Sequence, residues 1–371
     1  MRGGFRRHAA TFGRFAREQI LELTAAAIAA AFLISGRVTP RAALHAIDVD
    51  LLLVLFALLI TVEILRESGY LDLAVARTVS RFASTRRFAI ALIIATGLLA
   101  SLVTNDVTLF IVIPFTVLAS RMSSFPLENI VVLEIIASNL LGCLTPLGNP
   151  QNLFVFHQSG WSAVHFVATM APFVGWCAGG LLIATFFAVD AAPMTTPSET
   201  LPERNTAMAV AGAICFALVL LEIARVANAW PAAIAAAAGA ALFLRGRIFD
   251  LDLSIIPLFF FAFIAVEGLR TFDLPHIGNI YASAILISQV ISNVPATVLL
   301  TPFAAGHWKT LLYGVSAGGC GTIIASLANL LGWRIYMRDS GAHPRFIWRL
   351  TAFNFAFLGW AGVGGWVLLG N

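Results

Sequence analysis

The sequence predicts an all-α polytopic membrane protein that consists of two inverted repeats. Hydrophobic residues make up 59% of the 371 residues, and charged residues only 11%. A soluble domain of this size would expose much of that apolar surface to water, whereas a bilayer solvates it. Short polar motifs also recur in the same order in both halves of the chain. We therefore expect about nine spanning helices, with one re-entrant helical hairpin and one unwound transmembrane helix in each repeat.

The first pair of motifs places an asparagine at the same point of each half. Thr104-Asn105-Asp106 lies between two apolar stretches, and Ser292-Asn293 does the same, with its asparagine 188 positions later. Polar groups at membrane depth are costly unless they line a cavity or bind a ligand. A matched pair of such motifs, one in each half, is how many secondary transporters form a central site.

The apolar arms beside these motifs are short. In the first half they cover 88–103 and 107–119, whereas a full span needs about 20 residues. We therefore predict re-entrant hairpins at 88–119 and 277–305. One long kinked span at each place is the alternative.

A second pair of motifs predicts a break in one transmembrane helix of each half. Pro146 and Pro150 each remove a backbone donor and clash with the preceding turn, so a continuous helix cannot pass through them. Three residue pairs share a spacing of 177 positions: Gly142 with Gly319, Thr145 with Thr322, and Asn152 with Asn329. We predict broken helices at 127–157 and 309–336. The alternative is a packing kink in which the asparagines cap loose carbonyl groups.

These features divide the chain into a basic N-terminus (1–17), repeat one (18–190), a linker with a bridging helix (191–228) and repeat two (229–371). In this arrangement 18 of the 23 Lys and Arg residues lie on one side of the membrane. Positively charged loops favour the cytoplasmic side, so we expect the N-terminus inside and the C-terminus outside an inner (plasma) membrane. A signal peptide is the alternative for the N-terminus, but a matching Ala-rich stretch at 231–247 favours a retained helix.

The interrupted helices predict a central binding site. Helix ends expose unpaired backbone groups, and helix N-termini attract anions. Free carbonyls together with Ser, Thr and Asn oxygens suit a small hard cation such as sodium. The predicted substrate- or cation-binding residues are Thr104, Asn105, Asp106, Thr145, Gly148, Asn149, Asn152, Ser292, Asn293, Thr322, Ser326 and Asn329.

Two carboxylates are candidates for carrying a coupling proton. Asp106 is the only carboxylate in the two hairpin tips, and Glu134 lies inside the apolar run 127–145. Burial disfavours the charged form of a carboxylate, which suits proton binding. A helix-capping role for Asp106 and a structural role for Glu134 are the alternatives.

Other features exclude several functional classes. The sequence contains no Walker pattern, no Ser-His-Asp layout and no zinc motif, so we predict neither an enzyme nor a cofactor. The basic residues are spread over short loops, which argues against a nucleic-acid partner. The cysteines lie in apolar stretches and are expected to be buried thiols: Cys143, Cys177, Cys215 and Cys320. Local ion pairs are expected at two helix ends, Glu63 with Arg66 and Glu267 with Arg270.

Three segments resemble the ion-transporter superfamily, which includes arsenite-efflux permeases, divalent anion–sodium symporters, citrate permeases and sodium/proton antiporters. They are Thr104-Asn105-Asp106, residues 145–152 and Ser292-Asn293-Val294-Pro295, and the resemblance covers nearly the whole chain. It implies that two re-entrant hairpins and two unwound helices form the substrate and cation sites. It also implies an elevator motion against a scaffold, within a homodimer.

The resemblance also implies roles for single residues. Symporters of this superfamily carry a Ser-Asn-Thr triplet at both hairpin tips, where it contacts the substrate carboxylate and sodium. Here the first two triplet positions are matched, which implies a sodium site at Thr104, Asn105, Ser292 and Asn293. The third positions depart, because they are Asp106 and Val294. An Asn-Asp pair is more similar to the arsenite-permease branch and favours proton coupling.

The sequence thus predicts a secondary active transporter of a small inorganic or carboxylate anion, coupled to protons or sodium, which works by alternating access. Its expected partners are the small anion and the lipid bilayer. A cation/proton antiporter of the same fold is the alternative. A passive channel or a membrane assembly component is the alternative from a different class.

Overall fold

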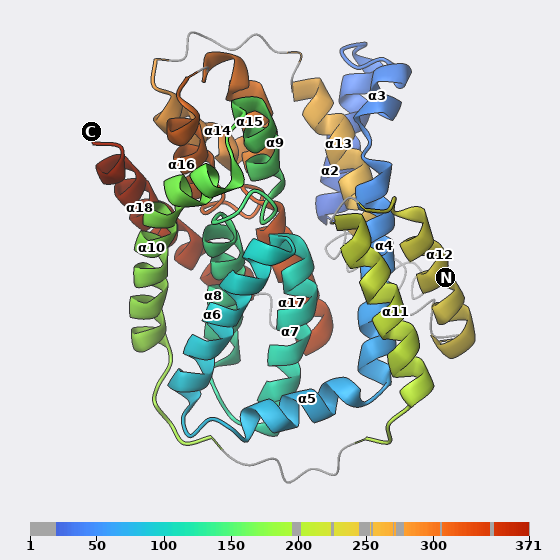
Figure 1. Cartoon of the computed structure of the whole chain (residues 1–371). Coiled ribbons are helices and arrows are strands. Elements are labelled where there is room, and N and C mark those ends of the chain that lie inside the picture. The colour runs from blue at the N-terminus through green and yellow to red at the C-terminus, as the bar shows by residue number, and fades with distance from the viewer. Residues whose placement is uncertain are drawn as a thin grey trace, which may run out of the picture.

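The described part of the chain is almost entirely helical (Figure 1), as the sequence predicts. The structure is a computed structural model that describes residues 20–194, 202–223, 226–244, 253, 255–269, 271, 278–304, 306–341 and 345–370. The first half contains α2 (Ile20–Ile34), α3 (Pro40–Ala46), α4 (Val49–Glu67), α5 (Tyr70–Val79), α6 (Thr85–Leu102), α7 (Asn105–Met122), α8 (Leu127–Gly142), α9 (Pro150–Ser159) and α10 (Ala163–Ala188). The bridging helix is α11 (Thr206–Ile223). The second half contains α12 (Trp230–Gly239), η1 (Ala240–Leu244), α13 (Ile255–Leu269), α14 (Ile280–Ile291), α15 (Asn293–Leu300), η3 (Thr301–Phe303), α16 (Trp308–Gly318), α17 (Leu327–Ser340) and α18 (Phe346–Leu368).

Several helices are suited to a bilayer. Within the described residues, α6, α7, α10 and α18 are long and apolar enough to cross a membrane, and shorter apolar helices accompany them. Helices α6 and α7 have 18 residues each, so they extend beyond the short apolar arms from which the hairpin was predicted. The polar residues Thr85 to Arg87 begin α6, and the polar residues Ser120 and Arg121 lie in the last turn of α7. They continue the helices past the apolar stretches. The second pair is short, with 12 residues in α14 and 8 in α15.

The helices form two groups (Figure 1). The α4 group contains α2, α3, α4, α11, α12 and α13, in which α4 packs against α11 and α12, and α13 against α2. The α8 group contains α6 to α10 and α14 to α18, in which α6 packs on α8, α7 on α17, α14 on α16 and α10 on α18. Helix α5 contacts both α4 and α7 and thus connects the two groups.

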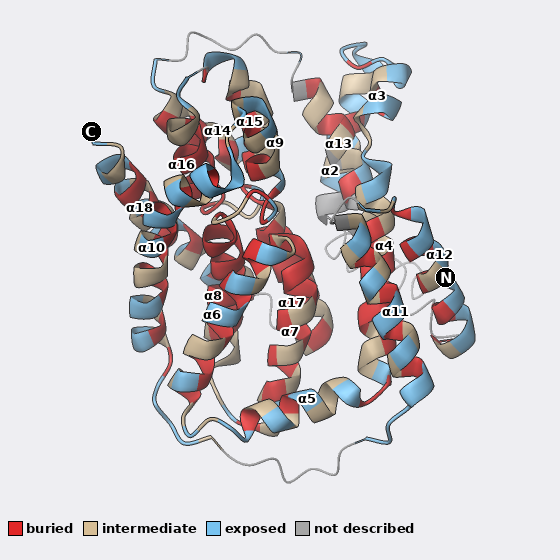
Figure 2. Ribbon diagram, viewed as in Figure 1, coloured by how far each residue is buried: buried red, intermediate tan, exposed pale blue. Residues whose placement is uncertain are grey.

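The most deeply buried helix is α8 (Figure 2). Every residue from Ile130 to Gly142 is buried, which is typical of a helix surrounded by protein on all sides. The outer helices instead expose large apolar side chains, such as Val164 and Phe187 on α10 and Trp348 on α18. Lipid chains solvate such side chains, so this pattern supports a multi-pass membrane protein.

Polar residues define where the long helices begin. An oxygen of Asp48 accepts from the backbone N–H of Leu51 at 3.0 Å and caps α4. The hydroxyl of Ser162 accepts from His165 N–H at 3.2 Å and caps α10. These side chains satisfy backbone donors that the first helical turn leaves unpaired. Helix α4 is followed at its C-terminal end by Gly69, whose φ of +72° suits a residue without a Cβ.

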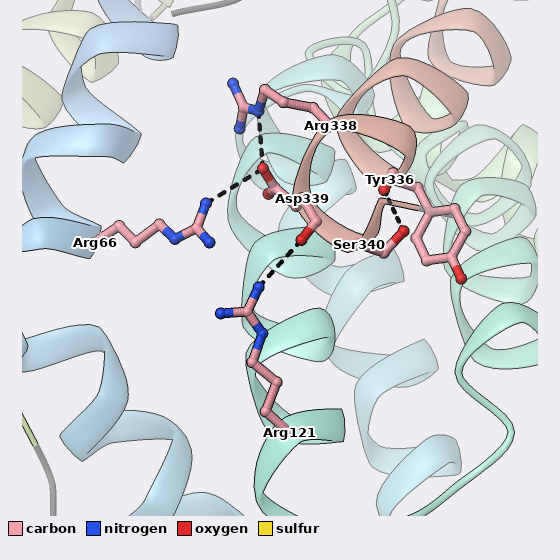
Figure 3. Close-up of polar contacts among 6 residues, drawn as sticks. All are labelled: Arg66, Arg121, Tyr336, Arg338, Asp339 and Ser340. Carbon is pink, nitrogen blue, oxygen red and sulfur yellow. Dashed lines mark hydrogen bonds and ion pairs between the residues drawn. The ribbon is translucent and has the colours of Figure 1, made fainter. Parts of the chain in front are cut away.

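A charge cluster connects the α4 group to the α8 group (Figure 3). Asp339 on α17 has a buried side chain, and its Oδ1 lies 3.4 Å from Nη1 of Arg66 on α4 and 2.8 Å from Nε of Arg338. Arg121 on α7 donates to the backbone oxygen of Asp339 at 3.2 Å. Arg66 therefore pairs with a residue distant in sequence, and the predicted local pair with Glu63 is wrong. Arg270 lies outside the described residues, so the other predicted local pair is not described.

Two tryptophans join the last helices of the two halves. The rings of Trp176 on α10 and Trp360 on α18 stack with centroids 4.9 Å apart. Each indole N–H donates to the backbone oxygen of the other residue, at 2.9 and 3.0 Å. Gly180 and Gly364 leave room for these rings, since a Cβ at either position would collide with the opposite indole.

We expect Gly180→Ala to destabilise the protein, because the added methyl group would displace a stacked and hydrogen-bonded ring. The expected cost is about 1–3 kcal/mol. The neighbouring Gly179→Ala is the matched control, since nothing lies within 4 Å of a Cβ there. Thermal unfolding of both variants in detergent checks this. Equal unfolding midpoints for the two variants would contradict the role of the tryptophan pair.

Candidate functional site

Each hairpin tip is bonded to the helix break of its own half. Helix α8 ends at Gly142 and α9 begins at Pro150, while α16 ends at Gly318 and α17 begins at Leu327. The backbone N–H of Asn105, at the α6–α7 tip, donates to Gly148 O in the first break at 2.8 Å. The N–H of Asn293, at the α14–α15 tip, donates to Ala325 O in the second break at 2.8 Å. The same contact therefore occurs in both halves, between residues with the spacings read from the sequence.

A second matched contact involves two residues that the sequence analysis missed. The Thr145 hydroxyl donates to Ser101 O, and the Thr322 hydroxyl donates to Gln289 O at 2.8 Å. Ser101 and Gln289 are each four positions before the tip asparagine, so the spacing of 188 would have identified them. Gln289 also donates to the oxygens of Gly318 and Cys320, at 2.9 and 3.0 Å.

Two predicted site residues hold the broken helices together. Asn152 Nδ2 donates to Cys143 O and Thr145 O, both at 3.0 Å. Asn329 Nδ2 donates to Gly319 O and Thr322 O, at 3.0 and 3.2 Å. Their amide N–H groups thus cap loose carbonyls, as the packing alternative expects.

Asn139 on α8 is a further residue that the sequence analysis missed. Its Oδ1 accepts from Asn105 Nδ2 at 3.2 Å and from the Ser326 hydroxyl at 2.7 Å. Its Nδ2 donates to Asn329 Oδ1 at 3.0 Å, and its backbone oxygen accepts from Asn149 Nδ2 at 3.2 Å. A polar residue inside the apolar helix at 127–145 was the signal that could have identified it.

The first half contains buried oxygens that have no hydrogen-bond partner. Those of the predicted site are Oδ1 of Asn105, Asp106, Asn149 and Asn152. In the second half the corresponding Oδ1 of Asn329 is satisfied, since it accepts from Asn139. A buried acceptor without a donor carries a desolvation cost that a proton donor or a cation would remove.

The two candidate proton carriers have different surroundings. Asp106 lies in the first turn of α7, beside the tip, and is 6% exposed. Glu134 on α8 is fully buried and accepts from the Thr116 hydroxyl on α7 at 2.6 Å. Asp106 is thus adjacent to the site, whereas the hydrogen bond of Glu134 is to a residue outside it.

The two tips differ in backbone conformation. Thr104 is extended, with φ −174°, and its hydroxyl accepts from Val107 N–H at 3.3 Å. Ser292 has φ +72° and ψ 152°, and it is the one non-glycine residue with positive φ in the described part of the chain. This region of backbone conformation is otherwise populated by glycine, and strain there is typical of functional sites.

We expect Ser292→Gly to stabilise the protein by about 1 kcal/mol, because relief of strain exceeds the entropy cost of glycine. The Ser292 side chain does not cap α15, so no capping bond is lost. Thr104→Gly, at the matching position, should instead destabilise, since it loses the cap of α7. Chemical unfolding of both variants measures the two changes in the free energy of unfolding, which should have opposite signs.

The site residues differ in burial. The amides Asn105, Asn149, Asn152, Asn293 and Asn329 are buried. The hydroxyl residues at matching positions of the two halves are half-buried, namely Thr104, Thr145, Ser292 and Thr322. These hydroxyl residues are therefore the more accessible part of the site.

Apolar spans around a polar, interrupted centre define a multi-pass membrane protein, and comparison with known proteins gives its class. Residues 15–329 match the family described as citrate transporter, and this chain belongs to that family. The predicted resemblance is thereby confirmed. The chain is a membrane transporter rather than an enzyme, and the class implies a small-molecule substrate.

The relatives are also membrane proteins. The chain is 33% identical to the inner membrane protein YbiR of Escherichia coli K12 over 345 residues, which are 89% of this chain and 90% of YbiR. It is 33% identical over 313 residues to an uncharacterized transporter of Methanocaldococcus jannaschii, covering 80% of this chain and 84% of that protein. An uncharacterized transporter of Mycobacterium bovis is 25% identical over 358 residues, with 82% of each chain covered.

Proposed function

We propose that this protein is a secondary active transporter of a small inorganic or carboxylate anion, coupled to protons or sodium, which works by alternating access. The observation that carries the proposal is the position of four helix N-termini. Helices α7 and α15 begin at the two tips, and α9 and α17 begin at the two breaks. Helix α7 packs on α17, and α15 packs on α9. Helix N-termini favour negative charge, and together they suit a small anion.

The half-buried hydroxyl residues support the same substrate class. Hydroxyl groups are donors that adapt to an anion. The Thr104 hydroxyl accepts from Val107 N–H and keeps its own proton for a ligand, and Ser292 is its counterpart in the other half. Thr145 and Thr322 donate to backbone oxygens and hold the breaks against the tips. In this proposal Asn293 completes the substrate contacts, and the free Oδ1 of Asn105 faces the coupling cation. The breaks supply the remaining ligands from Gly148, Asn149, Asn152, Ser326 and Asn329.

We also propose that the halves are inverted repeats, at 18–190 and 229–371, with re-entrant hairpins. The matched contacts of the tips and breaks support this. In Figure 1 the α6–α7 pair and the α14–α15 pair lie at opposite ends of the α8 group, with their tips directed toward its centre. The proposed topology has about nine spans, a cytoplasmic N-terminus and an external C-terminus. An elevator motion within a homodimer is part of the proposal by resemblance alone.

The unsatisfied oxygens favour one competing function, a cation/proton antiporter. Amide and carboxylate oxygens of Asn105, Asp106, Asn149 and Asn152 are ligands suited to sodium. In an anion symporter the same oxygens would bind the coupling cation, in a site that also includes Thr104. In an antiporter they would bind the transported ion itself.

Ligand-dependent thermal stabilisation of the purified protein separates these functions. The panel contains arsenite, antimonite, sulfate, phosphate, succinate and citrate, each with and without sodium and across a range of pH. A ligand at 100 times its Kd stabilises the native state by about 2.7 kcal/mol. Stabilisation by one anion supports the anion transporter, and a sodium requirement identifies the coupling ion.

A matched pair of variants ties the result to the site. Asn293→Ala should abolish the stabilisation, whereas Asn354→Ala should retain it, because Asn354 bonds only within α18. Stabilisation by pH or cations, with none from any anion, would replace the anion transporter by the antiporter. Uptake of the stabilising anion that does not exceed its external concentration would indicate a passive channel.

A further inference from the structure

The amide groups of the site are oriented by a chain of hydrogen bonds that begins at backbone carbonyls. Gly319 O and Thr322 O, exposed by the second helix break, both accept from the side chain of Asn329. Carbonyls only accept, so the side chain must present its Nδ2 to them. Its Oδ1 is then left to face Asn139.

The orientation of the Asn139 amide in turn determines that of the Asn105 amide at the first hairpin tip. Because Asn139 must give its Nδ2 to Asn329 Oδ1, its own Oδ1 faces the other way. There it accepts from the Ser326 hydroxyl and from Asn105 Nδ2, at 2.7 and 3.2 Å. Asn105 therefore keeps its Oδ1 free and presents an acceptor, not a donor, to the site. The second break thus determines which atom the first tip offers to a ligand.

The first break is hydrogen-bonded to the backbone oxygen of Asn139. Asn139 O accepts from Asn149 Nδ2 at 3.2 Å and from the Cys143 thiol at 3.0 Å. The corresponding position of the second half, 177 residues later, is Ser316. The buried Ser316 hydroxyl has no hydrogen-bond partner among the residues that the structure describes. The link between the halves therefore exists in one copy.

We propose that Asn139 is the positioning residue that joins both helix breaks and the first hairpin tip into one hydrogen-bonded unit. It couples the two halves of the proposed site, on which this inference rests, and it fixes the acceptor character of Asn105. Loss of the Asn139 amide would release the second break and the first hairpin tip together, whereas the bonds from the first break to the Asn139 backbone oxygen would remain.

Thiol alkylation tests this without any substrate. Cys143 lies in the first break and Cys320 in the second, and all four cysteines are buried free thiols. Cys177 on α10 lies near both break cysteines, so Cys215 on α11, in the α4 group, is the remote control. The purified protein is treated with N-ethylmaleimide, and the rate at each cysteine is followed by mass spectrometry. Asn139→Leu should raise the rate at Cys320, in the second break, by about tenfold or more, because Asn329 and Ser326 lose their bonds to the amide. The rate at Cys143 should rise less, since its thiol is bonded to the Asn139 backbone oxygen, which leucine retains. Cys215 should be unchanged.

Any other pattern of alkylation rates overturns the proposal. An increase at Cys143 alone would show a local role in α8, and an equal increase at all four would show general destabilisation. Asn354→Leu is the matched control, since it removes another buried asparagine without joining the halves, and it should leave both break cysteines unchanged. If Asn139→Leu does not fold, Asn139→Ser retains one hydroxyl and should give the same pattern with a smaller increase. If this pattern appears while no anion stabilises the protein, the coupling role stands and the proposed substrate class fails.

Discussion

Asp106→Asn is expected to abolish proton-coupled transport and to leave the protein folded. The carboxylate is buried in the first turn of α7, and its Oδ1 has no hydrogen-bond partner. Asparagine has nearly the same shape, so the free energy of unfolding should change by less than about 1 kcal/mol. It cannot bind and release a proton, so uptake of the identified anion should no longer follow an imposed pH gradient. Proteoliposomes with an internal pH dye report the proton flux, and accumulation of the labelled anion in the same vesicles reports its uptake.

Glu134→Gln is the control for this prediction. Glu134 is also a buried carboxylate, but its hydrogen bond is to Thr116 rather than to a site residue. This variant should retain uptake driven by the pH gradient. Full coupling in Asp106→Asn, together with its loss in Glu134→Gln, would transfer the proton-carrying role to Glu134.

Gly148→Ala is expected to have the largest effect on stability among the site variants. A Cβ at this position would collide with Gly142 O, and Ala100 O would lie 2.9 Å away. Both are backbone atoms that cannot move aside without shifting the break and the α6 terminus. We expect a cost of about 3 kcal/mol or more, together with loss of ligand-dependent stabilisation.

The second half provides the matched control for Gly148. Position 325 is related to 148 by the spacing of 177, and it is alanine. Ala325 offers the same carbonyl to its tip asparagine as Gly148 does. Ala325→Gly should therefore cost about 1 kcal/mol or less. The unfolding midpoints of the two variants check this, and a tolerated Gly148→Ala would mean that the first break can widen.

The sequence predicts the positions of the interruptions well, for a physical reason. Proline together with clustered polar residues interrupts an apolar helix, so Pro146 and the two tip asparagines identify the breaks and tips without structural information. Proline alone does not, because Pro114 and Pro172 lie inside α7 and α10. The roles of Asn152 and Asn329 are less predictable. Both repeat at the expected spacing, yet their amide N–H groups are used on carbonyls of their own breaks.

Contacts between distant segments could not be predicted from spacing. Asn139 reaches Asn329 across 190 positions, and its matching position in the repeat carries a serine. Arg66 has Glu63 one turn earlier, but its ion pair is with Asp339 on a different helix. In both cases the packing of distant helices determines the hydrogen-bond or ion-pair partner. Neither motif spacing nor proximity in the sequence reveals that packing.

Ser292 also bears on the thermodynamics of the transport cycle. In a protein with two identical inverted halves, the inward-facing and outward-facing conformations would be related by a two-fold rotation about an axis in the membrane plane and would have equal free energies. Backbone strain at a serine with positive φ is about 1–3 kcal/mol. Thr104, at the matching position of the other half, has no such strain, because its backbone is extended. If only one conformation relieves that strain, the resting populations would differ by about fivefold or more. A single backbone angle would then give the empty carrier a preferred side of the membrane.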